Sequence, residues 1–247
     1  MSAAGAPSWS GPRRIAHRGG GTLAPENTVA ALRAAMAHGY RGVEFDVMLT
    51  GDAVPVLMHD PDFGRTVGRT GSVATTSYAD LAASEAGSWF APRYAGEPVP
   101  RYVDAVRFCL ANDLWMNVEI KPSPGREADT GRIVGEATTM FGAQALPILF
   151  SSFSPVALDA ARMAAPDIPR GLLFGALPAD AIESARSLGC VSVHADHRHV
   201  GRDAIDRLHA AGLAVMLYTV DEAARAATLT AWGVDALCTD RIDLLPP

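Results

Sequence analysis

Short apolar runs alternate along the chain with segments in which apolar residues recur at helical spacing. The runs suit strands, and the segments between them suit helices. The pattern predicts strands at residues 14–16, 42–49, 54–58, 115–120, 147–151, 171–174, 190–194, 214–217 and 236–238. It predicts helices at residues 26–39, 103–112, 126–141, 155–164, 179–188, 203–211 and 221–232.

This alternation predicts an α/β fold, specifically a (β/α)8 TIM barrel. Counting the strands at 14–16 and 42–49, the chain has eight βα-like units, and 247 residues suit one such barrel. Glycines stand at four returns from helix to strand, where a left-handed residue commonly ends a helix: Gly39, Gly189, Gly212 and Gly233.

Residues 60–100 interrupt the pattern with Gly, Pro, Thr and aromatic residues. The segment is too long for an ordinary connection, so we expect a small insertion after the second barrel strand, forming a subdomain or a wall of the site. We expect residues 13–247 to form a single barrel domain and residues 1–12 to form a loose N-terminal tail.

Polar and charged residues stand where several of the predicted strands end. Burying unpaired polar groups costs free energy, and the carboxyl ends of barrel strands meet at one mouth, so such residues indicate a site there. The residues that we expect near the mouth are His17, Arg18, Glu44, Asp46, Glu119, Lys121, Ser151, Ser152, Phe153, His194 and Tyr218.

Three carboxylates form the first candidate group. Glu44 and Asp46 flank Phe45, so a strand would direct both acids to one face, and Glu119 ends the next βα unit. Like charges at close range raise each other's pKa, and a hard divalent ion such as Mg²⁺ or Ca²⁺ relieves this better than zinc. The alternative is that the acids form buried salt bridges with Arg18 and Lys121, which apolar residues often replace without loss of stability.

Two histidines form the second candidate group. His17 and His59 each follow an apolar run, and histidine titrates in the range where a general acid and base work. A lone histidine is more often structural, but two of them beside carboxylates and Arg18 favour catalysis. Arg18 can direct two donors to a phosphoryl group, although a surface position is the alternative.

Three further histidines carry weaker signals. His194 follows an apolar run and could face the barrel mouth, whereas His197 and His199 are expected in a solvated loop.

The composition limits the partners and the location. The formal net charge is −6 with no Lys/Arg run, which argues against nucleic acid as a partner. The N-terminus lacks the features of a signal peptide, and no apolar stretch reaches the length of a membrane span. We therefore expect a cytoplasmic protein without a membrane anchor, with reduced thiols at Cys109, Cys190 and Cys238.

Several dispersed motifs together resemble one known family. The motifs are His17-Arg18-Gly19, Pro25-Glu26-Asn27-Thr28, Glu44-Phe45-Asp46-Val47, His59-Asp60, Arg65-Thr66, Glu119-Ile120-Lys121 and Thr239-Asp240. On these motifs the chain is similar to the glycerophosphodiester phosphodiesterases over nearly its whole length, and it most resembles the cytoplasmic bacterial enzyme linked to glycerol-3-phosphate uptake.

The resemblance implies a TIM barrel that hydrolyses glycerophosphodiesters, as small-molecule substrates, to sn-glycerol 3-phosphate and an alcohol with a divalent ion. It makes His17 and His59 the acid/base pair. It makes Glu44, Asp46 and Glu119 the metal ligands and Arg18 and Lys121 the phosphate contacts, with Glu26 and Asn27 supporting the first loop. Independently of the resemblance, four aromatic residues are candidates for the wall of the glycerol pocket, although a place in the core is the alternative: Trp89, Phe90, Phe153 and Tyr218.

The chain departs from the family pattern at three places. Arg101-Tyr102 stands where many members have Thr-Leu, Tyr218 where many have Trp, and Asp221 where an Asn is common. None of these is an expected metal ligand or catalytic histidine, so they bear on the preferred alcohol and not on the reaction.

Two other functions fit the same residues less well. A phospholipase related to the phosphatidylinositol-specific phospholipases C would need a membrane-docking surface, and the sequence shows no basic amphipathic helix. A non-catalytic binder of glycerophosphodiesters would lack a ligand or a histidine, and all are present. The head-group preference and the oligomeric state stay open.

Overall fold

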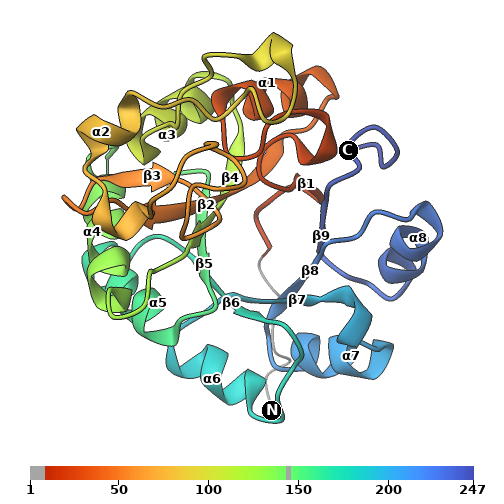
Figure 1. Cartoon of the computed structure of the whole chain (residues 1–247). Helices are drawn as coiled ribbons and strands as arrows, with labels where there is room; N and C mark the ends of the chain where they lie inside the picture. Colours follow the sequence, from red (N-terminus) through yellow and green to blue (C-terminus); the bar gives the residue numbers. More distant parts are fainter. Residues whose placement is uncertain (1–8, 143–145) are drawn as a thin grey trace.

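Eight parallel strands close into a barrel in the computed structural model, which describes residues 9–142 and 146–247 (Figure 1). Pairing of β1 with both β2 and β9 closes the ring. The barrel strands, in order of pairing, are β1 (Arg14–Ala16), β2 (Gly42–Leu49), β4 (Trp115–Ile120), β5 (Ile148–Ser152), β6 (Arg170–Phe174), β7 (Ser192–Asp196), β8 (Ala214–Tyr218) and β9 (Ala236–Thr239). The predicted TIM-barrel fold is confirmed.

Helices surround the barrel on the outside (Figure 1). They are α1 (Val29–Ala37), α3 (Tyr102–Ala111), α4 (Glu127–Thr139), α5 (Pro155–Ala164), α6 (Ala181–Ser187), α7 (Arg202–Ala210) and α8 (Ala223–Ala231). Turns follow β9, where the repeat would have placed an eighth helix. The four glycines predicted at helix-to-strand returns all have positive φ angles.

Two differences between the predicted and observed elements bear on the site. Helix α1 begins at Val29 because Thr28 caps it and Asn27 has a φ of +57°, which is incompatible with a helix that starts at residue 26. Strand β7 extends to Asp196, whereas the predicted strand ended at His194. The two residues beyond the predicted end are Ala195 and Asp196, and the apolar pattern does not extend through the charged Asp196.

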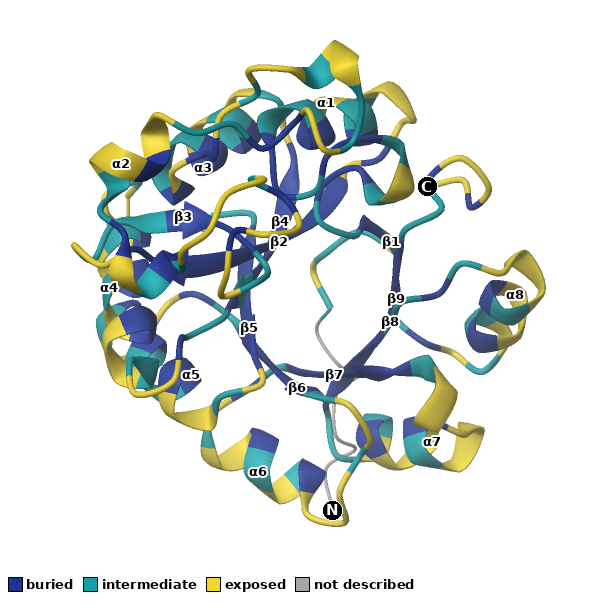
Figure 2. Cartoon of the chain, viewed as in Figure 1, coloured by how far each residue is buried: buried dark blue, intermediate teal, exposed yellow. Residues whose placement is uncertain are grey.

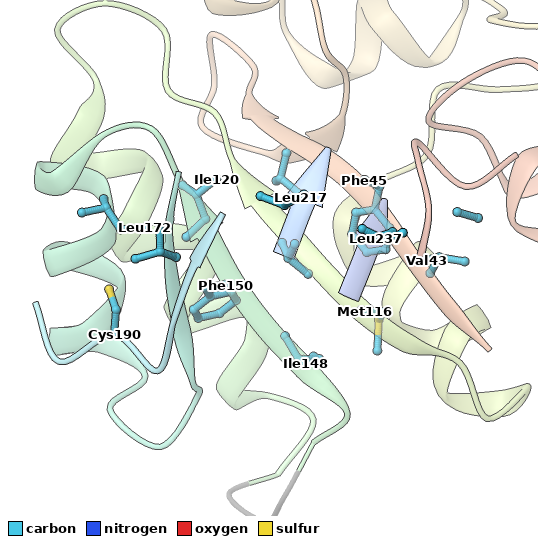
Figure 3. Packing of buried hydrophobic residues seen from close by; sticks show 14 of the residues in the cluster. Val43, Phe45, Met116, Ile120, Ile148, Phe150, Leu172, Cys190, Leu217 and Leu237 are labelled. Atoms are coloured by element: carbon cyan, nitrogen blue, oxygen red, sulfur yellow. The ribbon is translucent and has the colours of Figure 1, made fainter. Parts of the chain in front are cut away.

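The alternation within the strands divides the buried side chains into two layers. Val43, Phe45 and Val47 of β2 pack outward in the main core between barrel and helices, so Glu44 and Asp46 point into the barrel. Figure 3 shows part of this core, including Phe45, Met116 and Phe150. In Figure 2 the strands are buried and the outer helix faces exposed. The core thus fixes the direction of the acids.

The interior of the barrel, away from the mouth, is closed by a smaller cluster. Trp9 packs on Trp115 with ring centroids 5.2 Å apart and meets the edge of His194 at 6.3 Å. His194 is fully buried, and burial lowers its pKa to about 3. The prediction that His194 could face the mouth is therefore wrong, because its strand extends two residues beyond it.

The predicted loose tail, residues 1–12, is only partly within the described residues, since residues 1–8 lie outside them. Trp9 is half-buried and donates from Nε1 to the carbonyl oxygen of Pro12, at 3.2 Å. Residues 9–12 therefore pack against the barrel.

The segment between β2 and α3 forms a wall on one side of the barrel. Strand β3 (Pro55–Leu57) pairs antiparallel with β2, and the short helix α2 (Tyr78–Ala82) and the 3-10 turns η2 (Val73–Thr75) and η3 (Pro92–Tyr94) follow it. A separate apolar cluster holds this segment on β2 and β3: Met48, Val56, Met58, Phe63, Val73, Leu81, Ala86 and Val99.

Among the described residues, none of the helices is long and apolar enough to cross a membrane. Cys109, Cys190 and Cys238 are buried as free thiols, as predicted.

Candidate active site

Three carboxylates converge at the mouth of the barrel. Glu44, Asp46 and Glu119 each offer an oxygen, and these atoms lie within 4.8 Å of one another. Glu44 and Asp46 are 3% and 1% exposed, so water screens their charges little. The register of β2 and β4 places Asp46 directly beside Glu119, which is why acids from two strands meet.

The charges of these carboxylates are not balanced by neighbouring cations. Burial and the charge of Asp46 raise the pKa of Glu44 to about 7 and that of Glu119 to about 8. Burial alone would raise the pKa of Asp46 as well, but Lys121 and Arg18 hold it below its usual range. The cluster therefore favours binding a proton or another cation.

The free oxygens of the cluster fit a hard divalent ion. Glu44 Oε1 and Glu119 Oε1 are buried and accept no hydrogen bond from the described residues. Carboxylate oxygens in this number suit Mg²⁺ or Ca²⁺. The salt-bridge alternative is weaker, because the Nε of Arg18 lies 3.7 Å from Asp46 and the Nζ of Lys121 lies 3.5 Å from Asp46 and 3.9 Å from Glu119.

The loop after β1 holds two of the carboxylates in place. The Arg18 backbone N–H donates to Glu44 Oε2 at 2.8 Å. Asn27 forms a two-way pair with Asp46: its Nδ2 donates to Oδ2 at 2.8 Å, and its Oδ1 accepts from the Asp46 N–H at 3.0 Å. Arg18 and Asn27 both have positive φ angles, an uncommon conformation that often occurs at functional sites.

Each of the two predicted catalytic histidines is hydrogen-bonded to a carboxylate through Nδ1. His17 Nδ1 lies 2.8 Å from Asp240 Oδ1, and His59 Nδ1 lies 2.6 Å from Asp60 Oδ1. This arrangement leaves both Nε2 atoms available to other groups, and that of His17 lies 3.9 Å from Glu44. Asp240 and Asp60 thus restrain the two imidazoles.

The two histidines differ in their proton affinity. Burial lowers the pKa of His17, but the hydrogen bond with Asp240 and the charge of Glu44 outweigh burial and raise the pKa to about 9. Burial lowers the pKa of His59, and the opposing charge of Asp46 does not compensate. The site therefore holds a more basic and a less basic imidazole.

A cavity of about 190 Å³ opens between these groups. Its lining includes nine residues to which the sequence analysis assigned a role: His17, Arg18, Glu44, Asp46, His59, Glu119, Lys121, Phe153 and Tyr218. Glu26 and Asn27 lie behind this lining and contact Arg18 and Asp46.

Comparison with known proteins agrees with this geometry. The model of the glycerophosphoryl diester phosphodiesterase family matches residues 17–244. The chain belongs to this family. The family predicted from the sequence is confirmed.

Individual relatives cover most of the chain. The Bacillus subtilis protein YhdW is 31% identical over 238 residues, which span 94% of this chain and 95% of that protein. A glycerophosphodiester phosphodiesterase of Caldanaerobacter subterraneus is 29% identical, covering 92% and 93%. The solved structure of an Oleispira antarctica phosphodiesterase, in complex with the product sn-glycerol-3-phosphate, has a TM-score of 0.89 at 35% identity and covers 93% of both chains.

The structure of the present chain adds residues to the site that the sequence analysis did not assign to it. Asp60 adjoins His59 in the chain, and Asp240 follows the last strand. Both are polar residues at the end of a predicted strand, so the criterion that identified the other residues could have identified them. Arg65 of the insertion joins Glu26 and Asp60. It also contributes, with Trp89, to a second cavity of about 340 Å³ that shares His17 and Arg18 with the first.

The weaker histidine predictions have mixed outcomes. His199 is exposed, as expected of a loop residue. His197 is only half-exposed, because the guanidinium Nε of Arg225 donates to its Nδ1 at 3.2 Å.

Gly21 offers a test of the His17–Asp240 pair. Gly21 has a φ of +53°, and a Cβ there would collide with the carbonyl oxygen of Asp240. Gly68 has a φ of +67° but open space around it. In both Gly21→Ala and Gly68→Ala we expect a loss of about 1–2 kcal/mol of stability from the left-handed conformation.

Only Gly21→Ala should also displace Asp240, and we expect its kcat for glycerophosphocholine to fall roughly 100-fold, since small displacements of catalytic groups have such effects. Chemical denaturation and steady-state kinetics measure the two quantities. Equal activity of the two variants would contradict a role for the position of Asp240.

Proposed function

We propose that the chain hydrolyses glycerophosphodiesters to sn-glycerol 3-phosphate and an alcohol, with a divalent cation. The observation that carries this proposal is that a carboxylate cluster, two carboxylate-backed histidines and two cationic side chains converge on one cavity. The product named in the Oleispira antarctica complex agrees with it.

Glu44, Asp46 and Glu119 would hold the ion, which we propose to be Mg²⁺ or Ca²⁺. A bound ion of this kind would polarise the phosphoryl group and neutralise negative charge that develops on its oxygens. Asn27 and the backbone of Arg18 orient the carboxylates for this task.

Arg18 and Lys121 would bind the phosphoryl oxygens. The Nη1 atom of Arg18 donates to Glu26 at 2.9 Å, while its buried Nε donates to no partner among the described residues. The Nζ of Lys121 lies in the cavity wall at 3.5 Å from Asp46 and has further donors to offer. The two cations therefore compensate the charge of an anionic substrate in a chain whose net charge is −6.

His17 and His59 would act as the general acid and base. Their Nδ1 atoms are held by Asp240 and Asp60, so proton transfer would occur at Nε2. One imidazole would take the proton of the attacking hydroxyl while the other gives a proton to the leaving alcohol.

The two cavities suggest how the substrate lies. Phe153 and Tyr218 meet edge to face at 6.2 Å and wall the first cavity, and Tyr218 is held by a hydrogen bond from its hydroxyl to the Phe174 carbonyl at 2.8 Å. We place glycerol there. The second cavity lies beyond His17 and Arg18, beside Trp89 and Phe90, and is the place for the leaving alcohol.

The requirement for the ion is tested by turnover of glycerophosphocholine. Chelation by EDTA should abolish turnover, and Mg²⁺ or Ca²⁺ should restore it. We expect Glu119→Gln to lower kcat/KM roughly 100-fold or more, because the ion contributes several kcal/mol to transition-state stabilisation. Glu136→Gln, an exposed position on α4, is the matched control.

Full activity in exhaustively chelated protein would exclude the ion from the reaction. The same assay with phosphatidylinositol micelles separates the proposed function from a phospholipase, because a phospholipase would cleave the micellar lipid faster than glycerophosphocholine.

The route of attack is tested with a substrate that lacks the 2-hydroxyl of glycerol. We propose that this hydroxyl attacks phosphorus and gives a cyclic phosphate, which water then opens as the two histidines exchange roles. An internal nucleophile gains an effective molarity of about 10⁵ M or more. The 2-deoxy analogue should therefore bind and inhibit without being cleaved. Its hydrolysis at the rate of the natural substrate would instead show direct attack by water.

A further inference from the structure

Arg65 connects the His59 side of the site with the Arg18 side through a continuous series of ion pairs. All three nitrogens of its guanidinium are used: Nε donates to Asp60 Oδ2 at 2.6 Å, Nη1 to Glu26 Oε2 at 2.6 Å, and Nη2 to Glu26 Oε1 at 2.7 Å. Planar bidentate pairing of this kind fixes orientation as well as distance.

The two carboxylates that Arg65 holds each contact a residue of the proposed machinery. The other oxygen of Asp60 accepts from His59 Nδ1 at 2.6 Å, and Glu26 Oε1 also accepts from Arg18 Nη1 at 2.9 Å. The result is an unbroken series His59–Asp60–Arg65–Glu26–Arg18. It connects a proton-transferring imidazole with a phosphate-binding guanidinium.

We propose that Arg65 is a positioning residue that sets the orientations of His59 and Arg18 together. The expected effect of Arg65 on turnover rests on the proposed function. The expected effect of Arg65 on the orientation of His59 does not depend on that function. Without Arg65, Asp60 would keep only His59 as an ion-pair partner among the described residues and could turn away from the imidazole. Glu26 would keep Arg18 alone and would no longer be held by the insertion.

The location of Arg65 fits positioning better than stabilisation of the fold. Its side chain is 43% exposed, and ion pairs at such positions contribute little to stability. It also lies over the ring of Trp89, with 5.9 Å from Cζ to the centroid, which restricts its side chain from one side. The insertion therefore supplies an anchored guanidinium beside the residues that the barrel strands and their loops provide.

Arg69 provides a matched control within the same segment. It too is an exposed arginine over an aromatic ring, that of Phe63 at 5.4 Å, and it donates to Ser84 and Asp80. None of these residues lines the two cavities of the site.

The experiment compares Arg65→Ala, Arg65→Lys and Arg69→Ala in the full chain with Mg²⁺ and glycerophosphocholine. Arg65→Ala should lower kcat about 100-fold, since displacements near 1 Å can cost this much. Arg65→Lys should recover only part of the rate, because an ammonium cannot bond to three carboxylate oxygens in one plane. Arg69→Ala should stay within threefold of the wild type.

Two further readouts separate positioning from a structural role. Ethylguanidinium added to Arg65→Ala should raise the kcat of this variant at least tenfold. In proton NMR, the downfield Nδ1–H signal of His59, assigned by its loss in His59→Gln, should be present in Arg69→Ala and lost or broadened in Arg65→Ala. The affinity for Mg²⁺ should not change, because Arg65 contacts neither Glu44, Asp46 nor Glu119.

The inference is overturned if Arg65→Ala keeps a rate within threefold of the wild type, or if it keeps the His59 signal. It is also overturned by a third result: the circular-dichroism spectrum of Arg65→Ala shows an unfolded protein, ethylguanidinium does not restore its activity, and Arg65→Lys is fully active. That result would indicate that Arg65 only stabilises the fold through its charge. A wild-type protein without turnover would refute the proposed function, and the NMR comparison would still decide the role of Arg65.

Discussion

The site depends on one electrostatic constraint: three carboxylates converge in a buried place without enough positive charge around them. Glu44, Asp46 and Glu119 approach within 4.8 Å, and burial raises the pKa of two of them to about 7 and 8. A barrel core with apolar residues at these positions would be more stable. The arrangement creates a strong local preference for a cation.

The barrel makes this arrangement possible by separating two tasks within each strand. The outward residues of β2, such as Phe45, bury apolar surface against the helices at about 1.5–3 kcal/mol for each large side chain, and so hold the inward acids in place. The loop after β1 and the insertion then add Asn27, Arg18 and Arg65 around the acids and histidines. The free energy from packing thus offsets the electrostatic cost of the site.

Much of this could be predicted from local sequence patterns. The alternation of Glu44, Phe45 and Asp46 and the apolar run before His59 each follow from a few consecutive residues, and the repeated strand–helix order predicts the barrel that brings them together. The side-chain pairs that join distant parts of the chain could not be predicted from local sequence patterns. Whether His17 meets Asp240, or Arg65 meets Glu26, depends on how the strand ends and the insertion lie in space. His194 was misplaced because β7 continues for two residues beyond it, to Asp196.

The most direct test of this account is a calorimetric titration of the ion-free protein with Mg²⁺ or Ca²⁺ at pH 7 in two buffers of different ionisation enthalpy. At pH 7 the raised pKa values leave Glu44 and Glu119 partly protonated, and an ion bound between them lowers those pKa values, so binding must release protons. The account predicts one ion bound per chain with net proton release that shrinks toward pH 9, and much weaker binding in Glu119→Gln. Binding without proton release at pH 7, or with an affinity that Glu119→Gln leaves unchanged, would contradict it.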